Sequence, residues 1–247
     1  MATLKIIRIP ILPFRMVNCF LILGKEGSIL VDTGLPGSEA KIGKALRKHS
    51  LSFKDIMLII ITHAHVDHAG SAARMRELSG APIVAHAGDL KHYTREVPMT
   101  FCPTGWFGHL FKATGLILQP YTAFRPDILL TNDEVLAIDY YGIPGVVKHT
   151  PGHTAGSITV ELNTMDAMVG DLVASGILIG GIVRTRHAIR PPFEDDPYAV
   201  AAEQLRLIDF GTKRFYMGHG GPLEADEVQR HVHILRSLTS QGQPNSH

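Results

Sequence analysis

The pattern of apolar and polar residues divides the chain into short strands and helices. Residues 57–61 are five consecutive apolar residues rich in β-branched side chains, which is typical of a strand that is covered on both faces. Glycine, proline and polar turns bound the other apolar runs. In the first half we predict strands at residues 4–9, 17–23, 28–32, 57–61 and 83–85 and helices at residues 40–46 and 69–78.

The second half of the chain has a similar order of elements. We predict strands at residues 135–138, 145–149, 158–162, 165–169 and 213–217 and helices at residues 197–209 and 223–238. Because strands precede helices in both halves, the pattern favours an α/β fold, a pseudo-duplicated four-layer αβ/βα sandwich. We expect a single domain over residues 1–240 and a disordered tail over residues 241–247.

Residues 93–128 interrupt this pattern with proline, glycine and aromatic residues. The segment contains the only tryptophan, Trp106, and we predict few regular elements in it. A long irregular segment in a compact domain is usually functional or mobile, so we expect a pocket wall or a lid. A hydrophobic cluster that merely covers the core, or a dimer surface, is the alternative.

Residues that bind metals follow the apolar run 57–61 directly. Residues 62–70 read Thr-His-Ala-His-Val-Asp-His-Ala-Gly. His63 and His65 are two residues apart in an extended segment, so they project to the same side and can bind one ion as a pair. Asp67 is a predicted N-cap of the following helix. Because Asp67 and His68 diverge at a helix start, a second ion suits them better than the first.

Three further candidate ligands lie where a predicted strand ends in a turn that contains glycine. They are His153 in Pro-Gly-His, Asp171 in Gly-Asp and His219 in Gly-His-Gly-Gly. Glycine lets the backbone turn sharply and approach an ion closely, although a single histidine beside a glycine is usually a turn residue. Together with the motif they make five histidines and two aspartates, which is enough for two ions.

These motifs resemble the metallo-β-lactamase superfamily of dinuclear metallohydrolases, from Asp32-Thr33-Gly34 to Gly218-His219-Gly220. The resemblance implies the superfamily's αβ/βα sandwich and two divalent metal ions, with zinc expected first and manganese or iron as alternatives. It implies that one ion is bound by His63, His65 and His153, the other by Asp67, His68 and His219, with Asp171 bridging. Asp32 is similar to the superfamily's carboxylate that orients a ligating imidazole, and a turn cap is the alternative.

The resemblance also implies a reaction. We expect a metal-dependent hydrolase that cleaves an ester, lactone or thioester with a metal-bridging hydroxide, because bound cations lower the pKa of water to about 7. Asp67 is the candidate catalytic residue that orients this nucleophile. A mononuclear iron-dependent sulfur dioxygenase of the persulfide type is the rival, and β-lactamase activity as a side or main reaction is a further alternative.

Departures from individual branches of the superfamily leave the substrate open. Asp171 stands where the β-lactamases usually lack a bridging carboxylate. Acyl-homoserine lactonases typically have a tyrosine three residues past that aspartate, and this chain has Ala174. Glyoxalase II enzymes add a C-terminal helical region that binds glutathione, whereas the segment after His219 is short. A non-enzymatic binding module predicts eroded ligands, and all seven candidates are present.

Composition narrows the classes of partner. The chain has 247 residues, of which 45% are hydrophobic and 19% charged, as in ordinary soluble globular proteins. A formal net charge of +1 with scattered lysines and arginines predicts neither a nucleic acid nor a membrane partner, so we expect a small-molecule substrate. Charged residues and prolines interrupt residues 1–23, which predicts a cytoplasmic protein without a signal peptide. The oligomeric state stays open.

Fourteen histidines are an unusual number, and those outside the motifs have ordinary explanations. We expect surface positions for His49, His231 and His233, and hydrogen-bonding scaffold roles for His86 and His149. With Arg184 and Arg186, His187 faces either an anionic substrate group or solvent in a basic loop. The two cysteines, Cys19 and Cys102, are expected to be free thiols because their contexts differ and neither has zinc-ligand spacing.

Overall fold

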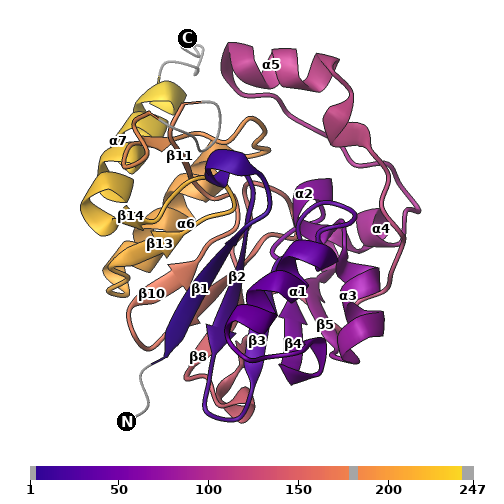
Figure 1. Ribbon diagram of the computed structural model, residues 1–247. Coiled ribbons are helices and arrows are strands. Elements are labelled where there is room, and N and C mark those ends of the chain that lie inside the picture. The colour runs from indigo at the N-terminus through magenta and orange to yellow at the C-terminus, as the bar shows by residue number, and fades with distance from the viewer. Residues whose placement is uncertain (1–3, 178–182, 241–247) are drawn as a thin grey trace.

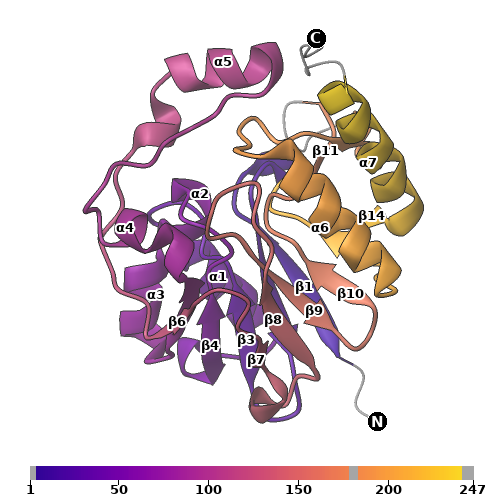
Figure 2. The same cartoon turned by 180° about the vertical axis from the view of Figure 1, so that it is seen from behind.

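The computed structural model describes residues 4–177 and 183–240 as four layers, with two facing β-sheets between two layers of helices (Figure 1). Helices α1 (Glu39–Lys48) and α3 (Ala72–Ser79) cover the outer face of one sheet. Helices α6 (Pro197–Asp209) and α7 (Ala225–Ser240) cover the other, as the reverse view also shows (Figure 2). The predicted αβ/βα sandwich is therefore confirmed.

The first sheet has six strands in sequential order and confirms the predicted meander. The strands are β1 (Lys5–Pro10), β2 (Asn18–Leu23), β3 (Ser28–Val31), β4 (Ile56–Ile60), β5 (Ile83–His86) and β6 (Ile128–Leu130). The first three pair antiparallel, whereas β3, β4, β5 and β6 pair parallel. Parallel strands share one direction, so the ends of β4 and β5 lie at the same edge of the sheet.

The second sheet also has six strands, in the order β14-β13-β10-β9-β8-β7. They are β7 (Leu136–Ala137), β8 (Gly145–His149), β9 (Ile158–Leu162), β10 (Asp166–Met168), β13 (Arg214–Tyr216) and β14 (Leu223–Glu224). Strands β9 and β10 form the predicted hairpin, and β10 runs parallel to β13. A separate pair consists of β11 (Ala174–Ser175) and β12 (Ala188–Ile189).

Strand β4 shows why an uninterrupted apolar run belongs at the centre of this fold. Its side chains alternate between two cores: Ile59 packs toward the helices on the outer face, and Leu58 and Ile60 pack between the sheets. All three are fully buried. Because successive strand residues point to opposite faces, a strand that is covered on both sides needs apolar residues at every position.

Several predicted boundaries are corrected by the structure. The single helix predicted over residues 69–78 is two helices, α2 (Val66–Ala69) and α3, because Ser71 has non-helical dihedral angles. The predicted N-cap role of Asp67 is wrong: His65 is the N-cap, and Asp67 lies in the first turn. The last helix begins two residues later than predicted, because Leu223–Glu224 pairs with β13.

The segment over residues 93–128 has more regular structure than we predicted. It includes the nine-residue helix α5 (Gly105–Ala113), whose glycines and aromatic residues hide its helical character in the sequence. Figure 1 shows α5 at the top, set apart from the helices that cover the sheets. The remaining short helices are α4 (Leu90–Tyr93) and 3-10 turns at Pro13–Arg15, Phe53–Asp55, Ala87–Asp89, Leu116–Leu118 and Asp139–Tyr141.

Other predictions about the chain have mixed outcomes. Cys19 is buried, Cys102 is exposed and both are free, as predicted. Within the described residues, no helix is long and apolar enough to cross a membrane. The tail predicted over residues 241–247 lies outside the described residues, and the domain boundary at residue 240 stays a prediction.

The core between the sheets gives a direct stability prediction. We expect Ile60→Ala to lower the free energy of unfolding by about 2–5 kcal/mol, because it leaves a cavity between two sheets that cannot close over it. Val135→Ala, at a side chain that is 54% exposed, is the control and should change it little. Denaturant unfolding followed by circular dichroism measures both; similar losses in the two variants would contradict this view of the core.

Candidate metal centre

The structure brings together all seven residues that the motifs singled out. Each lies just beyond the C-terminal end of a strand or in the short helix α2, and all of these ends meet at one end of the sandwich. The Ile158 N–H donates a hydrogen bond to the Thr62 carbonyl and joins the two sheets there. The two clusters that could hold an ion are His63, His65, His153 and Asp171, and Asp67, His68 and His219.

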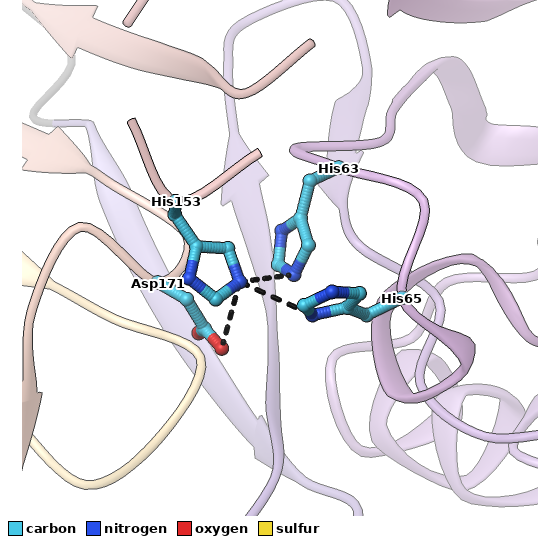
Figure 3. A group of neighbouring side chains, drawn as sticks. All are labelled: His63, His65, His153 and Asp171. Carbon is cyan, nitrogen blue, oxygen red and sulfur yellow. Dashed lines mark hydrogen bonds and ion pairs between the residues drawn. The ribbon is translucent and has the colours of Figure 1, made fainter. Parts of the chain in front are cut away.

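Three imidazoles of the first cluster point at one another (Figure 3). His153 Nε2 lies 3.1 Å from both His63 Nε2 and His65 Nδ1. Nitrogens that each sit 2.0–2.1 Å from a tetrahedral zinc ion are about 3.3 Å apart, so this spacing fits a shared ion. The predicted same-side projection of His63 and His65 holds in the structure, with their rings 4.6 Å apart.

The second cluster combines two imidazoles with carboxylates. His219 Nε2 lies 3.4 Å and His68 Nε2 lies 3.9 Å from Asp67 Oδ2. His219 Nδ1 donates to the carbonyl oxygen of Met16, which turns Nε2 toward the cluster. Asp67 and His68 therefore belong to a different cluster from His63 and His65, as their divergence at the helix start predicts.

Asp171 lies between the two clusters. Its Oδ2 is 2.9 Å from His219 Nε2 and 3.7 Å from His153 Nε2, and its Oδ1 is 3.4 Å from His68 Nε2. One carboxylate thus contacts histidines of both groups. This is the position that a bridging ligand requires.

Unpartnered buried atoms provide an independent test of whether cations fit here. Asp67 Oδ1, His68 Nε2 and Asp171 Oδ1 are buried and have no hydrogen-bond partner among the described residues. Leaving buried polar groups unpaired costs free energy, and cations together with their bound water would satisfy all three. Imidazole nitrogens and carboxylate oxygens are also the donors that zinc prefers, so the residues fit divalent ions.

A carboxylate behind the histidines sets the direction of two rings. Asp32 Oδ2 is 2.8 Å from His68 Nδ1, and Thr62 Oγ1 donates to Asp32 and lies 3.0 Å from His63 Nδ1. If each ring donates from Nδ1, its Nε2 keeps a free lone pair that faces the centre. Asp32 is thus placed where the resemblance implied, whereas the linking role of Thr62 was not predicted from the sequence.

A second buried carboxylate, Asp89, was also missed. Its Oδ2 accepts from the Ala64 N–H at 2.9 Å and from Thr154 Oγ1 at 2.9 Å, and its Oδ1 accepts from the Gly156 N–H at 2.8 Å. Ala64 separates His63 from His65, and Thr154 follows His153. Asp89 therefore fixes the two loops of the first cluster relative to each other. A Cβ at position 156 would lie 2.7 Å from Asp89 Oδ1, so this approach needs glycine.

The loop that carries His219 is fixed by Asn18 of β2. The Asn18 side-chain amide donates to the carbonyl oxygens of Gly218 at 3.1 Å and Gly220 at 3.2 Å, and its backbone N–H also donates to Gly218. Gly218 itself passes so close that a Cβ there would lie 2.3 Å from His68 Cε1. The sequence offered a signal for Asp89, which follows a strand end, but none for Asn18.

Burial and charge separate the protonation of the two clusters. Burial, together with neighbouring histidines, holds the pKa of His63 and His65 well below the ordinary value and lowers that of His153 to about 4. Burial also acts to lower the pKa of His219, but Asp171 and Asp67 outweigh it and raise the pKa to about 9. Before a cation binds, the three imidazoles of the first cluster are neutral at pH 7, whereas His219 is protonated.

The space in front of the centre is narrow and apolar. Phe111, Ile117, Pro192 and Phe193 line it with the ligating groups, and only about 10 Å³ is free. Phe111 and Ile117 belong to the segment predicted as a pocket wall, and that interpretation is confirmed for them. Trp106, by contrast, is 74% exposed and does not line this space.

The other histidines include one that departs from its prediction. His86 and His149 stack at 3.7 Å and contact backbone oxygens, so their scaffold role is confirmed. His231 is buried, not on the surface, because its face of α7 packs inward. His187 contacts Glu227 at 3.2 Å and, like the exposed Arg184 and Arg186, is not among the described residues that line the centre, so an anion-binding role for this loop stays a prediction.

Comparison with known proteins gives a consistent picture. The sequence profile of the metallo-β-lactamase superfamily matches residues 12–219. A hydroxyacylglutathione hydrolase of Haemophilus influenzae is 28% identical over 234 residues, which cover 93% of this chain and 97% of that protein. A probable metallo-hydrolase of Bacillus subtilis is 26% identical over 181 residues, 72% of this chain and 74% of that protein.

Solved structures extend the comparison to the fold. The crystal structure of a metallo-β-lactamase family protein from Thermus thermophilus superposes with a TM-score of 0.65 at 21% identity. The match covers 98% of this chain and 80% of that one. At this identity the likeness concerns the fold alone.

The contacts of Asp89 predict a selective effect on metal affinity. We expect Asp89→Asn to lower the affinity of the first cluster for its ion by about 10–100-fold. An amide has a single oxygen, so it cannot accept hydrogen bonds at both positions as the carboxylate does. Competition with a chelator measures the affinity. Amide hydrogen exchange at Ala64 and Gly156 shows directly whether the hydrogen bonds that hold the two loops are lost. Asp166→Asn, at a buried aspartate paired with Arg214, is the matched control. Wild-type affinity in Asp89→Asn would contradict the role.

The raised pKa of His219 predicts how metal affinity depends on pH. A nitrogen must lose its proton before it binds a metal. With a pKa of about 9, His219 is protonated at pH 7. Burial acts to lower the pKa of His68, but Asp171 and Asp32 outweigh it and raise that pKa well above its ordinary value too. Affinity should therefore rise by at least about tenfold per pH unit toward pH 9. Calorimetry in two buffers of different ionisation enthalpy should show proton release on zinc binding at pH 7. Affinity that is independent of pH between 6 and 9 would refute it.

Proposed function

Because the chain belongs to the metallo-β-lactamase superfamily of metal-dependent hydrolases, we propose that it hydrolyses an ester, lactone or thioester of a small molecule. The reaction takes place at two divalent cations, with zinc as the expected metal. The carboxylate of Asp171 is the single observation that carries the proposal, since it contacts histidines of both clusters. His63, His65 and His153 hold one ion, and Asp67, His68 and His219 hold the other.

The bound ions supply a water-derived nucleophile at neutral pH and a Lewis acid for the carbonyl oxygen. The chain's own residues position the reaction. Asp67 Oδ1 has no hydrogen-bond partner among the described residues, so it is free to accept a hydrogen bond from the attacking water and orient it. Phe193 and Ile117 exclude bulk water from the centre, which strengthens its electrostatic interactions.

The overall step is a balanced hydrolysis. The water oxygen forms a bond to the carbonyl carbon, the carbon–oxygen or carbon–sulfur bond breaks, and the leaving alcohol or thiol takes the remaining proton. The neutral imidazoles of the first cluster support this chemistry, because a buried His153 with a pKa of about 4 is ready to bind a metal at pH 7. A hydroxyacylglutathione is a thioester, so the name of the Haemophilus influenzae relative favours the acyl classes.

Elemental analysis and a substrate panel test the proposal. We expect two zinc or manganese ions per chain, and turnover of at least one of a lactone, a thioester or an aryl ester above turnover of a β-lactam. Asp171→Ala and His65→Ala should lose metal and lower kcat/KM by at least about a hundredfold. His233→Ala, on the exposed side of α7, is the control.

Three results would overturn this assignment. One iron per chain with oxygen uptake on a persulfide would support the mononuclear dioxygenase, which is the rival reaction. Unchanged turnover in metal-depleted Asp171→Ala would remove the metal centre from the mechanism. A β-lactam turned over faster than every ester, lactone and thioester would move the substrate class to the β-lactamases.

A further inference from the structure

A cavity of about 420 Å³ lies beside the metal centre, within the size range of small-molecule sites. Ala64 and Val66 of the histidine motif form one wall, and Met99, Phe101 and Tyr121 form much of the rest. The Tyr121 hydroxyl donates to the Ala64 carbonyl at 3.0 Å. That bond occupies the hydroxyl and leaves the ring as an apolar surface.

The cavity and the metal centre share a wall. Ile117 lines both, and the ring of Phe101 lies 4.9 Å from the ring of His65. The centre itself has only about 10 Å³ of free space, which is too little for more than the reacting group. The body of a substrate must therefore lie elsewhere, and this cavity is the adjoining space.

The lining also limits the chemistry of what binds. Most of it is apolar, so it offers few hydrogen bonds to a polar substrate. The charged or ionisable side chains that line it include His92 and Arg95, and none of the described lining residues is acidic. The Arg95 guanidinium makes one long contact, 3.5 Å, with the Tyr121 carbonyl, and a guanidinium has five N–H donors.

We propose that this cavity binds the acyl chain of the substrate, and that Arg95 and His92 receive an anionic group at the far end of that chain. The substrate class is then an ester, lactone or thioester of a medium-length acid with a second acidic group. The ester, lactone or thioester chemistry in this inference rests on the proposed function, whereas the binding site rests on the cavity alone. Each buried methylene contributes up to about a fourfold gain in affinity, so lengthening an apolar acyl chain should raise its affinity for the cavity measurably.

Binding to the metal-free protein tests the site without relying on catalysis. Octanamide, which is neutral, and octanoate are the probes, and calorimetry measures their affinities. We expect Met99→Trp, which fills the cavity, to weaken both by at least about tenfold. Arg95→Gln should weaken octanoate by about fivefold and leave octanamide unchanged. Met165→Trp, at a residue that is 47% exposed and remote from this lining, is the matched control for adding an indole.

The outcomes are separable from those for the proposed function. Equal affinities in wild type and Met99→Trp would overturn the inference, as would an Arg95→Gln effect that is the same for both probes. Arg95→Gln changes a surface side chain, so it keeps the test decisive if Met99→Trp does not fold. On the metal-loaded protein, kcat/KM should rise with acyl length and fall in Met99→Trp. No hydrolysis of any panel substrate, with acid binding intact, would refute the reaction and leave the site standing.

Discussion

The burial of so many ionisable groups at one point is the constraint on which the rest of the structure depends. Five imidazoles and two carboxylates converge at one end of the sandwich, and each is nearly or fully removed from solvent. Such a cluster is unfavourable unless its charges are compensated. The chain compensates in part through Asp171, which lies against protonated His219. Buried atoms without a hydrogen-bond partner among the described residues, such as His68 Nε2, lie where a cation could complete this compensation.

Rigid attachments keep this cluster from relaxing. Asp32 and Thr62 fix the rings of His63 and His68, Asp89 joins two loops, and Asn18 holds the turn before β14. Apart from the contact between Thr62 and its neighbour His63, each of these attachments links segments that are far apart in sequence. The two sheets therefore act as a frame whose ends must stay in register, and the core between them contributes to the geometry of the centre as well as to stability.

Much of the fold and of the candidate site could be predicted because their signals are local. The apolar run before His63 indicates a strand, and the histidine spacing indicates a shared ion within a few residues. The roles of Asp89 and Asn18 could not be inferred in this way, although Asp89 follows a strand end, since these roles depend on hydrogen bonds across 25 to 202 residues of sequence. His231 was misplaced because a helix periodicity shows which residues share a face, but not what packs on it.

The residues around the centre are of two kinds, those that could bind the ions and those that line the space in front of them. The ligating residues sit on strand ends that the sheets hold in place, so a change there alters the reaction itself. Much of the wall comes from residues 93–128, which pack against the centre through a few side chains such as Ile117 and Phe101, and Pro192 and Phe193 form the rest. This segment forms no strand of either sheet before β6 begins at Ile128, so its side chains can change at little cost to the frame. Under the proposed function, the reaction type therefore depends on the strand-end motifs and the substrate choice on residues 93–128, for which the sequence has no motif.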